Sequence, residues 1–521
     1  MPKPIQATSY TFRNIIEGVS LCGQNPVPLR IGAVSVRYIL CVAPAPLWQE
    51  LDDFHIGGDF SGSKELFQGL WIYDSDYQWE PYPVIHIDFG LSNITTAEQL
   101  QTGIQELLEE IAATYGITLT GDEFQNSLRN LVYQLAEAHG GKVVLLIDEY
   151  DRPIVDNLSD IEEAKQIRDV LRALYGVVKA LDRYWRFVFI TGISKFSRVG
   201  VFSTMNNLDD LTMDYRLANA LGITEAELTT YFQEYIEAFA QKRNVTPQAL
   251  LAQIRRWYDG FRFAAEGESL YNPYSTIQLF QKQRFANYWF ATGTPGFLIK
   301  LLRENEYDIP SLAHVEVDEI AFNTYELDNL AIIPLLFQTG YLTIKDFVED
   351  DLGEVYTLSY PNYEVEHAFV TYLLNAYNNG DIALTDTHLR RLIRALQSHD
   401  LAQFFTTLNI FFANIDYDLH LENEKYYQSI FYMIFLLLGL NIAAEIKTGN
   451  GRIDAVIELP DRVYLFEFKL NSTASAALKQ TKDKAYAEKY RARGKSITLV
   501  GANYLYKERK ITEWSSEEEQ A

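Results

Sequence analysis

Apolar residues in the first half of the chain alternate between short continuous runs and helical periodicity. The runs predict strands at 83–90, 143–147 and 185–190, and the periodic segments predict helices at 96–115, 122–139 and 161–181. Strands that alternate with helices indicate a parallel sheet. We therefore expect a doubly wound α/β domain in this part of the chain.

The pattern changes twice further along. Residues 214–379 are helical and aromatic, and within them 335–347 and 355–369 predict a helix and a β-hairpin, the order of a small winged-helix module. Residues 378–386 have the composition of a linker, and 445–471 alternate like a β-meander after a buried helix at 431–440. We expect three domains, at 1–213, 214–379 and 380–521.

Two carboxylates follow the buried run at 143–147, at the edge of the sheet where such folds place their chemistry. Asp148 can hold Mg²⁺ against nucleotide phosphates, and Glu149 can orient or activate the attacking water. This is the Walker B arrangement of nucleoside triphosphatases. The alternative is that both acids only cap the turn after an ordinary strand.

The segment TGISKFS follows the strand at 185–190. Thr191 or Ser194 lies there at the position where ATPases keep a residue that senses the γ-phosphate. The alternative is a turn from strand to loop with a helix cap.

A second set of charged residues lies in the predicted meander. Asp454 belongs to one strand, and Glu467 and Lys469 belong to the next, two residues apart and so on one face. Asp and Glu can bind a divalent cation, and Lys can stabilise charge on a phosphate. Gln480 follows on a helix predicted at 476–491. The alternative is a surface ion pair, but the otherwise apolar strands favour a site.

Composition narrows the classes of partner. The formal net charge of -25 argues against a broad nucleic-acid-coating surface, yet lysines and arginines gather at 479–495. Nucleic acid, with DNA favoured, is expected to bind there. The two cysteines exclude a disulfide framework and a Cys-based zinc site. No segment has the pattern of a secretory signal or a membrane span, so we expect a cytoplasmic protein without a membrane partner, and an oligomer is allowed.

Several motifs occur in a fixed order: DEYDRP, TGISKFS, WYDGF, YNPYS, YW-ATGTP, LLFQTGYL, YPN-EV and the D…E-F-K meander. In this order they resemble the bacterial and archaeal family of AAA-ATPase-like proteins that end in a PD-(D/E)XK nuclease domain. The resemblance covers residues 4–18 and nearly all of the chain from 61 onward. It implies a P-loop-type parallel sheet domain, a helical and winged-helix-like middle, and a C-terminal α/β domain like that of restriction endonucleases.

The resemblance also implies roles for residues. Its ATPase part implies ATP and Mg²⁺ as cofactors, with Asp148 and Glu149 as the Walker B pair and Ser194 near the sensor position. Its nuclease part implies Asp454, Glu467 and Lys469 as the nuclease triad, with Asp454 and Glu467 as the metal ligands. It also implies Gln480 as a supporting residue and Glu424 as an acid on the first helix.

One part of the family pattern is missing. Between 18 and 61 the family requires a YVDKT segment and a phosphate loop that ends in Gly-Lys-Ser, because backbone N–H groups and a lysine must cradle the β- and γ-phosphates. The window 19–60 contains no Gly-Lys-Ser or Gly-Lys-Thr. It also holds both cysteines of the protein and four of its prolines, and it has no lysine.

This window matches the family in another reading frame. With synonymous codons chosen for 19–34 and read one base later, the segment Tyr-Val-Asp-Lys-Thr appears, and the same operation on 43–60 yields Gly-Lys-Ser across Trp48 to Leu51. Tryptophan has one codon, which limits the freedom of this choice. The hypothesis is that 19–60 is translated out of frame, and the alternative is a divergent but genuine segment.

The leading functional prediction is an ATP-binding AAA-like protein with a metal-dependent nuclease domain that hydrolyses phosphodiesters, whose ATP site is defective as written. We expect ATP binding near zero and a poorly packed or disordered segment at 19–60. The alternatives are a nucleotide-dependent regulatory or interaction switch without cleavage, and a non-functional frameshifted product.

Overall fold

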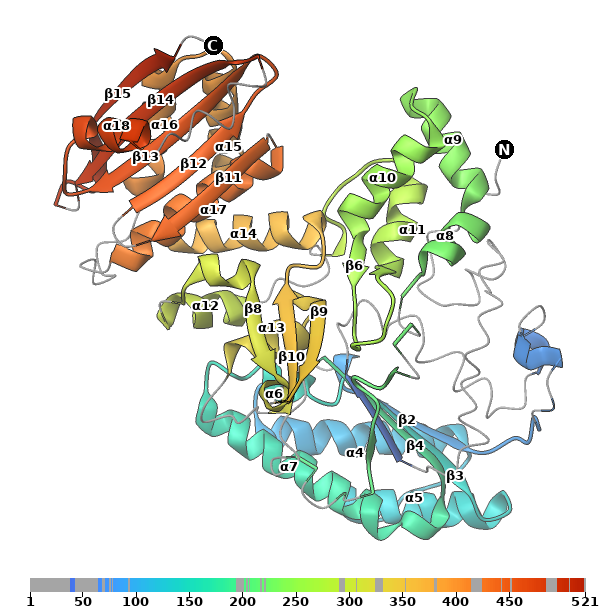
Figure 1. The fold of residues 1–521 in the computed structure, drawn as a ribbon. Helices are drawn as coiled ribbons and strands as arrows, with labels where there is room; N and C mark the ends of the chain where they lie inside the picture. Colours follow the sequence, from blue (N-terminus) through green and yellow to red (C-terminus); the bar gives the residue numbers. More distant parts are fainter. Residues whose placement is uncertain are drawn as a thin grey trace. The chain divides into compact units, whose positions relative to one another are not determined.

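The protein is described by a computed structural model that divides into two compact units, Met1–Thr294 with His314–Glu364, and Pro295–Ala313 with Val365–Ala521. Each unit is described below by itself (Figure 1). The structure describes residues 38–42, 64–67, 71–74, 76, 78–91, 94–193, 201–202, 205, 207–215, 218–219, 222–289, 296–305, 307–323, 331–351, 353–378, 382–413, 424–441, 443–449, 452–483, 494–505 and 507–519.

A five-stranded parallel sheet lies in the first unit, in the order β2-β3-β4-β1-β5. Its strands are β1 Tyr38–Val42, β2 Val84–Asp88, β3 Val143–Asp148, β4 Trp185–Gly192 and β5 Asp209–Asp210. All side chains of β3 except that of Asp148 are buried, as expected for a strand covered on both faces. The predicted parallel sheet is confirmed.

Amphipathic helices accompany this sheet, and they pack against one another (Figure 1). They are α4 Ala97–Thr114, α5 Phe124–Ala138 and α7 Ile161–Ala180, with the short α6 Arg152–Val155 after the predicted Walker B segment. Thr96 caps α4 and Asp160 caps α7, each by accepting a hydrogen bond from the third helical N–H. The three long helices lie where the apolar periodicity predicts them.

Strand β1 falls inside the window 19–60. The run YILCV pairs in parallel with β4 on one side and β5 on the other. The expectation of a disordered window is therefore wrong for the backbone of Tyr38–Val42, and the physical reason is visible in the sequence, since five consecutive apolar residues favour a buried strand. The rest of the window lies outside the described residues.

Helices and two small sheets follow in the described residues of the first unit. The helices are α8 Glu225–Tyr231, α9 Gln233–Arg243, α10 Pro247–Tyr258, α11 Pro273–Lys282 and α13 Ile332–Gln338, with the two-stranded β6 Asp259–Phe261 and β7 Leu270–Tyr271. Strands β8 Val315–Asp318, β9 Thr343–Asp350 and β10 Gly353–Ser359 form an antiparallel sheet in the order β8-β10-β9.

The helix and hairpin predicted in this region exist at shifted positions. Helix α13 ends at Gln338, and the hairpin is β9 with β10, so that 343–347 belong to a strand that was predicted to be helix. Residues 363–369 begin the helix α14 Tyr363–Asn378 and are not part of the hairpin. The turn at Gly340, whose φ of 79° suits glycine, ends the helix earlier than its apolar pattern indicates.

The second unit is built on a five-stranded sheet in the order β11-β12-β13-β14-β15, with one parallel pair, β13 with β14. Its strands are β11 Ala443–Gly449, β12 Arg452–Glu458, β13 Arg462–Leu470, β14 Ser496–Leu505 and β15 Lys510–Glu519. Its helices are α12 Gly296–Glu304, most of α14, α15 Ile382–Gln397, α16 Leu401–Ala413, α17 Glu424–Asn441 and α18 Ala474–Asp483. The predicted meander and the buried helix at 431–440 are confirmed.

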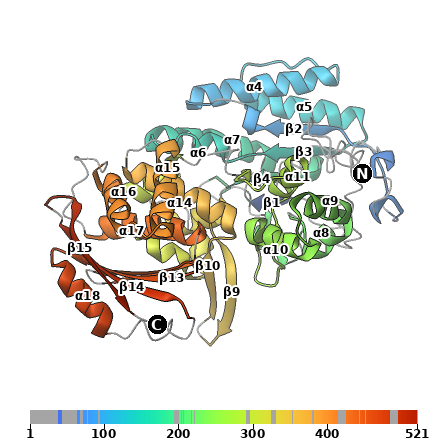
Figure 2. The same cartoon turned by 90° about the horizontal axis from the view of Figure 1, so that it is seen from above.

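The two faces of this sheet carry different helices. Figure 2 shows α18 on one side of β13 and β14, and α15, α16 and α17 on the other. The linker predicted at 378–386 is wrong, because 382–386 already belong to α15. Its Asn, Gly and Asp residues suggested a loop, but the apolar stripe that follows them extends the helix back to Ile382.

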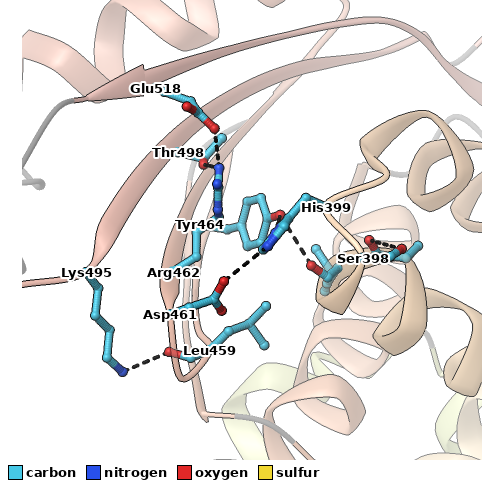
Figure 3. A network of polar contacts seen from close by, with 11 residues as sticks. Ser398, His399, Leu459, Asp461, Arg462, Tyr464, Lys495, Thr498 and Glu518 are labelled. Carbon is cyan, nitrogen blue, oxygen red and sulfur yellow. Dashed lines mark hydrogen bonds and ion pairs between the residues drawn. The ribbon is translucent and has the colours of Figure 1, made fainter.

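A polar network holds the turn between β12 and β13 (Figure 3). Nε2 of His399 lies 3.1 Å from Oδ2 of Asp461, and its Nδ1 lies 2.9 Å from the hydroxyl of Tyr464. Next to it, Arg462 donates to Oγ1 of Thr498 at 2.8 Å and forms an ion pair with Glu518 on β15. These contacts connect the turn and the start of β13 to His399, which follows α15, and to the strands β14 and β15.

Candidate functional site

The C-terminal sheet brings the predicted nuclease positions together. Position 454 in β12 lies directly opposite Glu467 in β13, which puts the two positions on one face. Lys469, two residues further along β13, shares that face. The side chain of Asp454 lies outside the described residues, as does that of Glu424, which is the first residue of α17.

Lys469 contacts two of the predicted partners. Its Nζ lies 3.4 Å from Oε1 of Glu467, and it donates a hydrogen bond to Oε1 of Gln480 on α18. The side chain of Glu467 is 1% exposed and that of Lys469 is 19% exposed. The alternative of a solvated surface ion pair is therefore wrong for Glu467.

The opposite face of β13 is a plain hydrophobic core. Phe466 packs on Phe404 and Phe435 with ring centroids 5.3 and 5.7 Å apart, and Phe468 packs on Phe431 at 4.9 Å. Because side chains of a strand alternate, this packing directs Glu467 and Lys469 to the face covered by α18. Burial of two charged groups among apolar neighbours is costly unless they are paired or bind a ligand.

This set of side chains fits a hard divalent cation. The carboxylate oxygens of Glu467 and of the residue at position 454 are the donors that Mg²⁺ prefers. The cationic Lys469 beside them is suited to an anionic phosphate bound next to the metal. Among the side chains that the structure describes, which do not include that of Asp454, no group of three or more His, Cys, Asp or Glu residues could hold a metal ion.

The second candidate site lies at the carboxyl edge of the parallel sheet. Oδ1 of Asp148 accepts hydrogen bonds from the hydroxyl of Thr191 and, at 2.7 Å, from the N–H of Glu149. Thr191 is the second-last residue of β4, next to β3, and is 1% exposed. The structure thus joins Asp148, the predicted Walker B acid, to Thr191, one of the two predicted sensor residues. The other, Ser194, lies outside the described residues.

Glu149 is held by a neighbouring arginine. Its backbone has a φ of 49°, which is uncommon outside glycine, and its Oε2 forms a 2.9 Å ion pair with Nη1 of Arg152. Burial raises the pKa of the Glu149 carboxyl, and the charges of Asp148 and Asp88 add to this effect while Arg152 opposes it. Backbone strain of this kind is often found at functional sites.

Asp88 completes this acidic edge and was missed in the sequence. It ends β2 in register with Asp148 at the end of β3, and its Oδ1 accepts the N–H of Gly90 at 2.7 Å. A Cβ at Gly90 would lie 2.6 Å from Oε2 of Glu149, so a larger residue there would require this carboxylate to move. The signal was present, because an acid ends the apolar run of the predicted strand at 83–90.

The described residues of the aromatic motifs in the middle region pack against other aromatic rings. The rings of Trp257 and Tyr363 lie 4.4 Å apart and those of Trp289 and Tyr341 lie 5.1 Å apart. The N–H of Trp289 donates to Oε1 of the fully buried Glu364 at 2.8 Å. Burial raises the pKa of Glu364 to about 8, so this acid is mainly neutral at pH 7.

Comparison with known proteins finds two separate matches, one around each candidate site. A family model described as a predicted AAA-ATPase matches residues 51–202, and a model of the PD-(D/E)XK nuclease superfamily matches residues 422–514. A protein of Azotobacter chroococcum mcd 1, described as an uncharacterized protein in the vnfD 5' region, is 38% identical over 460 residues, which is 87% of this chain and 86% of the relative. This chain belongs to the AAA-ATPase-like proteins with a C-terminal PD-(D/E)XK nuclease domain.

Both candidate sites of this AAA-ATPase-like protein lie inside the matched regions. Asp148, Glu149 and Thr191 lie in the first, and Glu467 and Lys469 lie in the second. The first match begins at residue 51, within the window 19–60. In the parts of the chain that the structure describes, every helix is too short or too polar to cross a bilayer.

Proposed function

We propose that this protein is a metal-dependent nuclease that hydrolyses phosphodiester bonds of nucleic acid, coupled to an ATPase-like domain. The observation that carries the proposal is the pairing of position 454 with a buried Glu467 whose carboxylate contacts Lys469. Buried charges of this kind do not stabilise a hydrophobic core, whereas the binding of a metal ion and a phosphodiester requires them.

Each residue has a defined role in the proposed reaction. Asp454 and Glu467 hold Mg²⁺, which when bound polarises the phosphate and lowers the pKa of water. Lys469 donates to the phosphate oxygens, where negative charge increases as the bond to water forms. Gln480 accepts a hydrogen bond from Lys469 and so keeps its ammonium group turned toward the acids.

The nucleic acid is proposed to be DNA, bound next to this face. Lys479 and Lys482 lie on α18, and Lys495 follows shortly after it in the chain. Lysines at this position can neutralise backbone phosphates although the whole protein carries a net charge of -25. The expected compartment is the cytoplasm, in keeping with a chain that has only two cysteines.

We further propose that the ATP site is incomplete in the chain as written. Asp148 would hold Mg²⁺ with the nucleotide, Glu149 would orient water, and Thr191 would sense the γ-phosphate through its hydrogen bond to Asp148. The Gly-Lys-Ser loop that should complete the site is absent from 19–60. The out-of-frame hypothesis accounts for that absence, and resequencing of the locus tests it: codons that cannot yield Lys-Ser in the shifted frame would refute it.

The nuclease proposal is tested with Lys469→Ala. Plasmid DNA and RNA are incubated with the full chain and Mg²⁺, and the wild type is expected to nick or cut one of them while the variant does not. Lys510→Ala is the control, because Lys510 pairs with Glu508 on the surface, lies outside the lysines proposed to bind DNA, and its loss removes a similar charge. Equal cleavage by wild type and Lys469→Ala would refute the assigned role.

A regulatory switch without cleavage is the second candidate, and the ion pair of Glu149 with Arg152 favours it. A water-orienting acid that is held by an arginine is not free to act, so nucleotide chemistry would require this pair to open. If the wild type in the repaired frame cuts no DNA or RNA but binds nucleic acid in a nucleotide-dependent manner, the switch is the better description.

A further inference from the structure

The turn between β13 and α18 connects the two elements that carry Lys469 and Gln480. It is held by side chains of the two following strands. The N–H of Ser472 donates to Oδ1 of Asn503 at 2.7 Å, and the N–H of Ala474, the first residue of α18, donates to Oε1 of Glu513 at 2.7 Å. Both bonds satisfy backbone donors that the turn and the helix start would otherwise leave open.

These two side chains lie in one row with Lys469. Asn503 on β14 pairs in register with Lys469 on β13 and with Glu513 on β15. Asn503 is 2% exposed, whereas Glu513 is exposed at the edge of the sheet. The row therefore runs from Lys469, the proposed catalytic lysine, to Glu513 on β15, which accepts the hydrogen bond from the first residue of α18.

Helix α18 lies unusually close to the sheet. A Cβ at Gly501 would lie 2.5 Å from both the carbonyl oxygen of Ala474 and the N–H nitrogen of Leu478, so the helix backbone rests on a position without a side chain. Gly501 pairs in register with Glu467. A small shift of α18 is thus a shift relative to the site itself, and it would move Gln480 away from Lys469.

The turn also contains a residue in a strained conformation. Asn471 has a φ of 52°, and its N–H donates to the carbonyl oxygen of Tyr504 at 2.9 Å. A left-handed residue persists when the surrounding contacts determine it. The hydrogen bonds to Asn503 and Glu513, which follow immediately, supply such contacts.

We propose that Asn503 and Glu513 are positioning residues of the nuclease site: they fix the turn after β13 and the start of α18, and thereby hold Gln480 against Lys469. This inference rests on the proposed nuclease function. Neither residue touches the substrate in this role, so their loss changes the rate of cleavage and not the binding of nucleic acid.

The test compares Glu513→Ala with Glu513→Gln in the full chain. Glu513→Ala is expected to lower kcat about 10-fold or more with KM unchanged, as is typical when a supporting contact is lost. Glu513→Gln keeps an oxygen that accepts from Ala474 and is expected to restore the rate. Because Glu513 is exposed, its truncation leaves the core intact.

Glu518→Ala is the matched control. Glu518 lies on the same strand but pairs with Arg462 at the far end of β13 (Figure 3), so its loss is expected to leave kcat unchanged. If Glu513→Ala behaves like Glu518→Ala, or if Glu513→Gln fails to rescue, the positioning role is refuted.

A second readout separates this inference from the proposed function. Deuterium uptake of the peptide 472–483 is expected to rise in Glu513→Ala and in Asn503→Leu but not in Glu518→Ala. This result is independent of cleavage. If the wild type cuts no nucleic acid, unchanged uptake still refutes the positioning role, and increased uptake supports it while the nuclease proposal alone fails.

Discussion

The two five-stranded sheets bring acidic positions together by different means. In the parallel sheet, Asp88 and Asp148 end neighbouring strands, and the site is an edge. In the C-terminal sheet, position 454 and Glu467 lie within neighbouring strands, and the site is a face covered by a helix. An edge site needs a loop from another segment to complete it, whereas the predicted metal ligands of the face site, Lys469 and Gln480 all lie within residues 452–483.

This difference explains why the two sites differ in vulnerability. The loop that would complete the first site belongs to the window 19–60, so an altered reading of that window removes half of the site. The second site shares no residue with the window. The predictions below test this contrast, from the largest expected effect to the smallest.

Repair of the reading frame over 19–60 is expected to have the largest effect. The repaired chain should bind ATP with a Kd in the micromolar range, and the chain as written should bind about 1,000-fold more weakly, a difference of about 4 kcal/mol. The reason is that the restored Gly-Lys-Ser loop supplies N–H groups and a lysine for the phosphates. Fluorescence titration with a labelled ATP analogue measures this, and micromolar affinity of the unrepaired chain would contradict it.

Substitution of one acid in each site shows which of the two sites is needed for cleavage. Glu467→Gln is expected to lower Mg²⁺-dependent cleavage about 100-fold or more, because one metal ligand loses its charge. Glu149→Gln is the same change of Glu to Gln in the other site. It is expected to leave cleavage by the chain as written unchanged. Initial rates on plasmid DNA measure both. Loss of cleavage in Glu149→Gln would show that the two sites are coupled.

Glu364 is a buried acid that lies in neither candidate site, and its effect on stability can be compared with theirs. Burial raises the pKa of Glu364 from 4.5 to about 8, so the folded state binds its proton more tightly than the unfolded state does. The contribution of Glu364 to the free energy of unfolding is therefore fully present below pH 4.5. It is lost as the pH rises to about 8, and the stability of the protein falls by a few kcal/mol over this range. Glu364→Gln should remove this decline.

Urea unfolding at several pH values, followed by tryptophan fluorescence, measures the decline. The control is Glu234→Gln on α9, because Glu234 is exposed and should not alter the pH dependence. A decline that is equally steep in wild type and Glu364→Gln would mean that Glu364 is not its source.

Glycine substitutions in the parallel sheet domain give the smallest effect. A Cβ at Gly192 would lie 2.4 Å from Oδ1 of Asp151 and 2.6 Å from Tyr150, so Gly192→Ala should destabilise the protein by about 1–3 kcal/mol. At Gly176 in α7 nothing lies within 4 Å, and Gly176→Ala should stabilise it by up to about 1 kcal/mol. Thermal unfolding distinguishes the two. A neutral Gly192→Ala would show that the edge beside Asp148 adapts easily.

Local patterns in the chain determined most of the elements. The buried run at 143–147, the helices before and after it, and the meander at 445–471 follow from apolar periodicity, which is a property of neighbouring residues. The same patterns pointed to Glu467, Lys469 and Gln480, because charges within an apolar strand and on the next helix stand out without knowledge of the fold.

Element boundaries were less predictable. Helix α13 ends at Gln338 and α15 begins at Ile382, against the predicted helix to 347 and linker to 386. In both cases the apolar and turn-forming residues are compatible with two assignments over a few positions, and the packing of the neighbouring strand or helix decides between them.

Only the tertiary structure decided which distant residues meet. The register that places position 454 opposite Glu467, the order that puts β1 between β4 and β5, and the proximity of Asp88 to Asp148 are long-range pairings. No local period encodes them, because they depend on how the strands are ordered and how the turns fix their register. The sequence by itself therefore named the chemical groups of this protein, and the strand order and register within each of its two five-stranded sheets decided which of those groups lie next to one another.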